Sequence, residues 1–290
     1  MPRVSANGLE FEYETFGAAE APPLLLIMGL GAQMTAWDDE FCRLLADAGF
    51  LVIRYDNRDT GLSSKLDGTV DIAAIFFGDT SGAPYTIEDM ADDADGILEA
   101  LDVPSAHVVG ASMGGMIAQA LAIRHPNRVK TLCSIMSTTG DPTVGQPTEE
   151  VIASMLQPGP IDRQGNIEAS LTSQQLIGSP AYPVDEERFR RRAGEAYDRA
   201  FFPEGVARHV AAILASPDRT PGLRGLRLPT LVVHGDADPL VTPTGGKATA
   251  AAVPNAELLV IPGMGHDLPP ALWPTIVSAI AANAAKAASR

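Results

Sequence analysis

A serine stands between two glycines in the segment Gly110-Ala111-Ser112-Met113-Gly114. An apolar run precedes the segment and a helical pattern follows it, which predicts a sharp turn from a strand into a helix. Small residues two positions to either side of the serine allow the strand and the helix to approach closely, and the serine is then exposed at the turn. We therefore predict that Ser112 is a nucleophile.

A serine hydroxyl is a weak nucleophile without a base, and the chain supplies a histidine and a carboxylate further along. One apolar run ends in an acidic turn that contains Asp238, and a later run ends in a glycine-rich loop that contains His266. We predict a catalytic triad of Ser112, Asp238 and His266. Asp236, in the same acidic turn, and Asp141, which follows another predicted strand, are the alternatives for the acid.

The order of these motifs resembles that of the α/β-hydrolases, in which serine, acid and histidine follow one another along the chain. Within that superfamily the chain is most similar to actinobacterial esterases such as aclacinomycin methylesterase. The shared motifs are the Met28-Gly29 opening, the run Arg54-Tyr55-Asp56-Asn57-Arg58-Asp59-Thr60-Gly61-Leu62-Ser63 and the ending Pro262-Gly263-Met264-Gly265-His266.

The resemblance implies a role for each site residue. His266 removes the proton of Ser112 as the serine oxygen attacks an ester carbonyl, and Asp238 holds the imidazole in the required tautomer. The backbone N–H groups of Met113 and Leu30 form the oxyanion hole that stabilises the tetrahedral intermediate.

Other residues near the predicted strand ends receive less direct roles. Met136 and Leu240 are expected to line the acyl pocket, with core packing as the alternative. Asp56 and Arg58 are expected to form a structural ion pair that braces their loop. Asp267, beside the candidate base, is expected to face solvent.

The remaining histidines and the two cysteines fit structural positions. We expect His107 in the core and His125 at the end of a helix. His209 is expected in an inserted segment and His234 at the end of a strand. Cys42 and Cys133 are expected to be small buried side chains without a disulfide.

Apolar runs alternate with helical patterns along most of the chain. This predicts an α/β class, the α/β-hydrolase fold, with a mostly parallel central sheet, helices on both faces and strands covered on both sides. Asn7-Gly8 predicts the turn of an N-terminal antiparallel hairpin whose second arm alternates as an edge strand does. Further strands are expected at 24–28, 51–55, 106–109, 129–136, 231–234 and 258–261, and helices at 36–48, 86–101, 114–125 and 269–286. Thr86 is expected to cap the second of these helices, and Asp89 suits its first turn.

This alternation stops between residue 139 and about residue 222, where stretches such as 148–156 and 185–199 indicate helices without intervening strands. We predict that 1–138 and 223–290 form the α/β-hydrolase core. The segment 139–222 is then a helical cap inserted after the sixth strand.

Composition narrows the classes of partner. The net charge of −15 disfavours nucleic acid and anionic membranes, because an acidic surface repels phosphate. No apolar signal core and no uninterrupted apolar run of roughly 18 residues is present, so we expect a cytoplasmic protein. No spacing of Cys or His suggests a metal, and no cofactor is expected. The sequence does not indicate an oligomeric state.

These observations favour a cofactor-free serine hydrolase acting on a carboxylic ester of a small apolar or weakly polar molecule, a methyl ester and a lactone included. Two alternatives remain. The same triad serves carbon–carbon bond hydrolysis or acyl transfer, or the pocket serves ligand binding with vestigial turnover.

Overall fold

The computed structural model describes residues 2–155, 157 and 159–287. In these residues eight strands form one sheet in the order β1-β2-β4-β3-β5-β6-β7-β8. The strands are β1 (Arg3–Ala6), β2 (Leu9–Phe16), β3 (Pro23–Ile27), β4 (Leu51–Tyr55), β5 (Ala106–Ala111), β6 (Val129–Ile135), β7 (Thr230–Gly235) and β8 (Glu257–Ile261). The β1–β2 and β2–β4 pairs are antiparallel and the other pairs are parallel, which confirms the predicted α/β class.

The N-terminal hairpin turns at Asn7 and Gly8, whose φ angles are 51° and 77°. Positive φ at both central residues is the geometry that an Asn-Gly pair favours in a two-residue hairpin. The expectation that the second arm is an edge strand is wrong. β2 lies between β1 and β4, and β1 forms the edge of the sheet.

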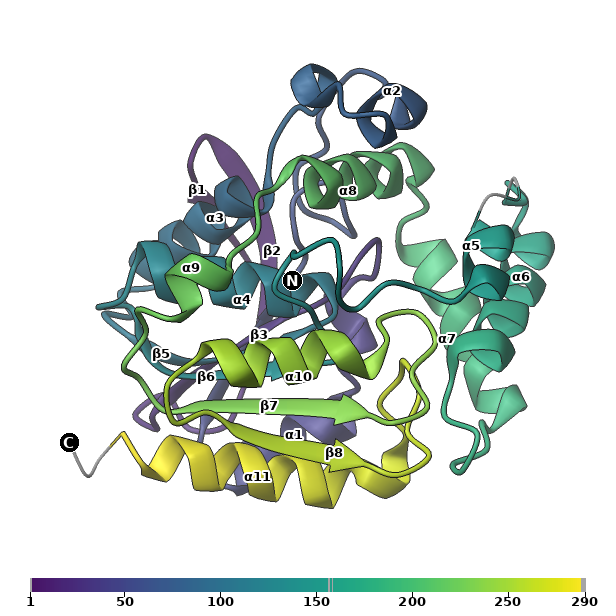
Figure 1. Cartoon of the computed structure of the whole chain (residues 1–290). Helices are drawn as coiled ribbons and strands as arrows, with labels where there is room; N and C mark the ends of the chain where they lie inside the picture. The colour runs from purple at the N-terminus through teal and green to yellow at the C-terminus, as the bar shows by residue number, and fades with distance from the viewer. Residues whose placement is uncertain (1, 156, 158, 288–290) are drawn as a thin grey trace.

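Helices cover both faces of the sheet (Figure 1). Alternate side chains of β3 point to opposite faces. Leu25 and Ile27 pack with α3 (Ile87–Ala100) and α4 (Met113–Arg124), whereas Leu24 and Leu26 pack with α1 (Asp39–Asp47) and α11 (Trp273–Ala285). The helices are α1 (Asp39–Asp47), α2 (Ile72–Phe76), α3 (Ile87–Ala100), α4 (Met113–Arg124), α5 (Glu149–Met155), α6 (Arg163–Ile177), α7 (Glu186–Arg199), α8 (Pro203–Ala215), α9 (Thr220–Leu223), α10 (Pro243–Ala252) and α11 (Trp273–Ala285).

Capping residues set two of the helix starts. Thr86 and Asp89 form the reciprocal capping box of α3, where Thr86 was expected to cap. α1 begins at Asp39 rather than near residue 36, because the Asp38 side chain accepts the backbone N–H of Glu40 at 3.0 Å and caps the helix there.

β8 differs from the other predicted buried strands. Leu258 and Val260 are 38% and 37% exposed, so the expectation of cover on both faces is wrong for this strand. Its position at the end of the sheet is the reason.

The segment between β6 and β7 contains α5 to α9 and no strand among its described residues. In Figure 1, α5, α6 and α7 group together beyond the arrowheads of β7 and β8. α8 lies apart from them and contacts α2, a helix that the sequence did not predict. Of the helix expected at 148–156, residue 156 lies outside the described residues.

Among the residues that the structure describes, no helix combines the length and the apolar character needed to cross a bilayer. Cys42 and Cys133 are both buried and unpaired, as expected.

Candidate active site

Ser112 lies at a strained turn between β5 and α4, with φ 56° and ψ −122°. A Cβ atom added to Gly110 would lie 2.0 Å from the carbonyl oxygen of Gly114. One added to Gly114 would lie 2.1 Å from the carbonyl oxygen of Ile27. Only glycine fits at these two positions, and their small size allows the helix to start against the strand and leave the serine at the bend.

His266 connects the serine to a carboxylate. Its Nε2 lies 2.9 Å from Ser112 Oγ, and its Nδ1 lies 2.7 Å from Asp238 Oδ2. Because the carboxylate accepts a hydrogen bond from the N–H at Nδ1, Nε2 is left with a lone pair directed at the serine hydroxyl. The three residues follow β5, β7 and β8, so the sheet brings together side chains that are up to 154 positions apart.

Asp238 is 3% exposed and held as an anion. Burial alone would raise its pKa, but hydrogen bonds from His234 and His266, charge attraction from His266 and the backbone N–H of Val241 lower the pKa to about 2. The His266 contact is the shorter one, since His234 Nε2 lies 3.5 Å from Asp238 and 2.7 Å from the carbonyl oxygen of Val241. Sequence reasoning missed this second histidine beside the acid.

The two alternative acids have other partners. Asp236 is exposed and accepts the backbone N–H of Gly263 at 2.6 Å. Asp141 accepts the backbone N–H of Thr143 at 2.8 Å. Of the three carboxylates, Asp238 is the one that contacts His266.

The loop after β3 lies against the serine. A Cβ atom on Gly29 would be 3.0 Å from Ser112 Cβ, so the backbone passes close to the hydroxyl-bearing carbon. The described residues provide no hydrogen-bond acceptor for the backbone N–H of Leu30 or of Met113. Two donors near a nucleophile with no protein acceptor are what an oxyanion hole requires.

Hydrogen bonds hold this loop at both ends. Asn57 Nδ2 donates to the carbonyl oxygen of Met28 at 2.9 Å. The backbone N–H of Gly31 donates to Nδ1 of His209, a residue of α8, at 3.1 Å. His209 was expected in the inserted segment, but nothing in the sequence indicated that it touches this loop.

The loop that carries His266 is also held by the inserted segment. The backbone N–H of His266 donates to the carbonyl oxygen of Ile177 at 2.7 Å. The expectation that Asp267 faces solvent is wrong, because its carboxylate accepts hydrogen bonds from Ser179 Oγ and, at 2.6 Å, from Gln174 Nε2. Burial raises the pKa of Asp267 despite these two donors.

The expected ion pair between Asp56 and Arg58 is wrong, because the loop turns them toward different elements. Arg58 donates to both carboxylate oxygens of Asp93 in α3, at 2.5 and 2.7 Å. Asp56 lies 2.7 Å from Arg199 of α7 and accepts the backbone N–H of Met34 at 2.7 Å. Both residues still brace their loop, but each does so with another partner.

The two residues predicted to line the acyl pocket are placed differently. Met136 is 3% exposed, has φ 42° and packs in the core beneath the sheet end. Leu240 is half-buried, and its backbone N–H donates to Asp238 at 2.9 Å. Neither lines the two cavities described next.

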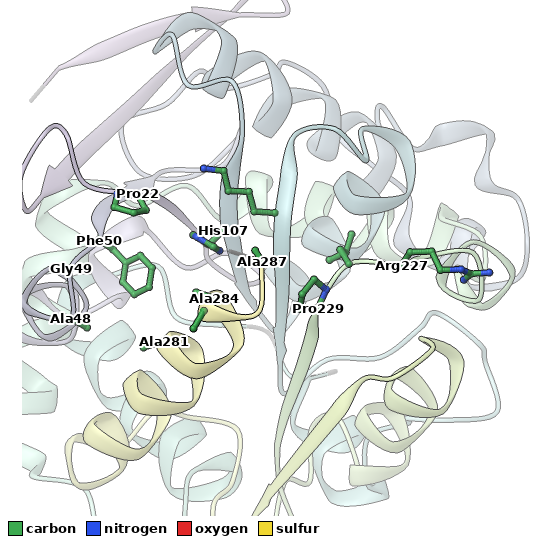
Figure 2. Close-up of a pocket in the computed structure, with 13 residues that line it drawn as sticks. Pro22, Ala48, Gly49, Phe50, His107, Arg227, Pro229, Ala281, Ala284 and Ala287 are labelled. Atoms are coloured by element: carbon green, nitrogen blue, oxygen red, sulfur yellow. The ribbon is translucent and has the colours of Figure 1, made fainter. Parts of the chain in front are cut away.

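One cavity, of about 490 Å³, lies between the loops at the sheet end and α6, α7 and α8, and its lining includes Gly31, Asp59, Thr60, Tyr197 and Phe201. The other, of about 810 Å³, is lined by residues where β3, β6 and β7 begin, so it is remote from Ser112 (Figure 2). Figure 2 places His107 and Phe50 near the end of α11 in this second cavity. His107 is 7% exposed, and burial lowers its pKa to about 4.

Comparisons with known proteins agree with this fold. The family model of the α/β-hydrolase fold matches residues 22–269. Rhodomycin D methylesterase DauP of Streptomyces sp. (strain C5) is 32% identical over 93% of both chains. 3-Oxoadipate enol-lactonase 2 of Acinetobacter baylyi is 25% identical over 89% of this chain and 87% of its own. The crystal structure of the enol-lactonase from Burkholderia xenovorans LB400 superimposes with a TM-score of 0.75 at 23% identity over all of both chains. The chain therefore belongs to the α/β-hydrolase fold family.

Proposed function

We propose that the protein is a serine hydrolase that cleaves carboxylic esters through Ser112, His266 and Asp238. The observation that carries the proposal is the continuous chain of contacts from Ser112 Oγ to His266 at 2.9 Å and on to Asp238 at 2.7 Å. Relatives named as a methylesterase and an enol-lactonase support an ester or lactone substrate.

In the first half of the reaction His266 Nε2 accepts the proton of Ser112 as its oxygen attacks the ester carbonyl. Asp238 stabilises the imidazolium that forms, and its low pKa keeps it ionised for that purpose. The imidazolium then protonates the departing alcohol, which leaves an acyl-serine. Water, deprotonated by the same imidazole, releases the acid in the second half. Each step uses side chains of this chain and water, so the proposal includes no cofactor.

The backbone N–H groups of Leu30 and Met113 are proposed to receive the negative oxygen of both tetrahedral intermediates. Met113 directly follows Ser112, and Leu30 follows Gly29, whose backbone passes close to Ser112 Cβ. These positions and the lack of an acceptor among the described residues support this role. One such donor contributes about 10²- to 10³-fold to kcat in serine hydrolysis.

We further propose that 139–222 acts as a cap over a core of 1–138 and 223–290. Contacts of this segment with both the Gly31 loop and the His266 loop support that division. The cavity of about 490 Å³ beside Gly31 would take a small apolar or weakly polar ester. The roles of Met136 and Leu240 in the acyl pocket, and a cytoplasmic location, stay predictions.

Hydrolysis of p-nitrophenyl acetate tests the proposal. The Ser112→Ala variant should lose about 10⁴-fold or more of the wild-type kcat while folding normally. A fluorophosphonate probe should label the wild-type protein at Ser112 and leave the variant unlabelled. Equal activity of the two proteins would refute the nucleophile, and a wild-type protein that neither hydrolyses the ester nor reacts with the probe would favour ligand binding.

A further inference from the structure

α8 carries a histidine that reaches the loop beside the candidate oxyanion hole. His209 is 0% exposed, and its Nδ1 lies 3.1 Å from the backbone nitrogen of Gly31, a residue 178 positions away. Its other ring nitrogen, Nε2, lies 2.8 Å from the carbonyl oxygen of Arg58. A carbonyl oxygen can only accept, so Nε2 carries the proton and Nδ1 accepts the N–H of Gly31.

The surroundings keep this imidazole neutral and in place. Burial lowers the pKa of His209 to about 4, and the charged groups that face it are Arg58, Asp59 and Arg208. The neighbouring Arg208 binds both oxygens of Asp59, at 2.8 and 2.9 Å, and both side chains are buried. The Tyr85 ring packs edge-on against His209 with 6.3 Å between centroids. Arg208 and His209 therefore both fix α8 to the core.

The bond from Gly31 has a direct effect on its neighbour Leu30. Gly31 has φ 64°, a left-handed conformation, and within the loop the backbone N–H of Ala32 donates to the carbonyl oxygen of Gly29 at 3.3 Å. The described residues provide the Leu30 N–H with no acceptor, so its direction depends on how its own peptide unit is held through the Gly29 oxygen and on the peptide units on either side. The Asn57 bond to Met28 fixes one side and the His209 bond to Gly31 fixes the other.

We propose that His209 is a positioning residue, whose Nδ1 lone pair holds Gly31 so that the N–H of Leu30 points at the oxyanion. The proposal rests on the proposed function, because it assigns a residue that acts through the oxyanion hole. The proposed role requires a hydrogen-bond acceptor at the position of Nδ1, and a side chain other than imidazole can supply it.

Two substitutions separate the two ring nitrogens. In His209→Asn the side-chain oxygen can occupy the place of Nδ1 and accept the Gly31 N–H, while the donor to Arg58 is lost. In His209→Gln the longer amide can reach Arg58 as a donor, while the acceptor near Gly31 is lost. We expect His209→Gln to lower kcat by about 10- to 100-fold with KM changed by less than about 3-fold, since the oxyanion donor is misdirected rather than removed. His209→Asn should stay within about 3-fold of wild type, because its amide oxygen still accepts the Gly31 N–H and the oxyanion donor keeps its direction.

His107→Gln is the matched control, because His107 is also a buried histidine but lies at the other end of β5 from Ser112. It should leave kcat unchanged. Inhibition by phenylboronic acid, which forms a tetrahedral adduct on the serine, supplies a readout that a general loss of packing would not reproduce. Its Ki should rise in His209→Gln by the same factor as kcat/KM falls, and should not rise in His209→Asn.

A measurement on the wild-type protein keeps the test independent of variant folding. With ¹⁵N labelling, a scalar coupling across the hydrogen bond should connect Gly31 N with His209 Nδ1, and His209 should carry its proton on Nε2 at pH 7. A proton on Nδ1, equal effects of Asn and Gln on kcat, or a Gln variant with wild-type kcat would each overturn the proposal. Wild-type hydrolysis of the ester in the same assay separates these results from a failure of the proposed function.

Discussion

Replacing Asp238 with asparagine should reverse the hydrogen bond that orients His266. The backbone N–H groups of Leu240 and Val241 both donate to Oδ1 of Asp238, at 2.9 and 3.0 Å. In Asp238→Asn these two donors select the amide oxygen for that position, so the NH₂ group is forced toward His266. It then donates to Nδ1 and places the imidazole proton on Nε2, where no lone pair remains to accept the proton of Ser112.

The expected loss in kcat is about 10⁴-fold, which corresponds to about 5 kcal/mol of activation free energy. Initial rates with p-nitrophenyl acetate at saturating substrate measure it, and thermal unfolding checks that the variant is folded. Asp236→Asn is the matched control, because it removes a neighbouring charge while its amide oxygen can still accept the N–H of Gly263. A kcat within 10-fold of wild type in Asp238→Asn would refute the tautomer argument. A large loss in Asp141→Asn would mean that the acid has been misassigned.

Three other outcomes follow from buried contacts. Arg208→Met should lower the free energy of unfolding by about 3 to 5 kcal/mol, because it leaves the Asp59 carboxylate buried without its cation, and adding Asp59→Asn should recover part of that loss in urea titrations. Gly114→Ala should abolish activity and lower the melting temperature, since its Cβ would lie 2.1 Å from a carbonyl oxygen of β3, and an unchanged melting temperature would contradict this packing. Burial lowers the pKa of His209 to about 4 in the folded state, against about 6.5 in the unfolded state. Between these values the unfolded state binds more protons, so the free energy of unfolding decreases as the pH is lowered. This group should remove about 3 kcal/mol of unfolding free energy between pH 6.5 and 4, and a curve in His209→Asn with the same pH slope would exclude it as the source.

Local signals in the sequence predicted the elements that carry the site. The glycines around Ser112, the Asn7-Gly8 turn and the cap at Thr86 each depend on backbone geometry within a few residues, and the structure contains the turn, the hairpin and the capping box. The alternation of apolar runs with helical patterns likewise predicted the parallel sheet, because it reports which strands are covered.

Side-chain partners were decided by packing between distant segments. Arg58 pairs with Asp93 and not with Asp56, because the loop after β4 turns the two charges toward different helices. Asp267 is half-buried against the end of α6, which the sequence placed in a separate segment.

The sequence by itself determined the order of serine, acid and histidine and the strand that precedes each, since these are properties of short stretches of chain. Only the tertiary structure decided that Asp238 contacts His266, and that His209 of α8 accepts the N–H of Gly31. The physical reason is that a hydrogen bond between residues 28 or 178 positions apart depends on how helices and loops pack on the sheet. The spacing of residues along the chain does not indicate that packing.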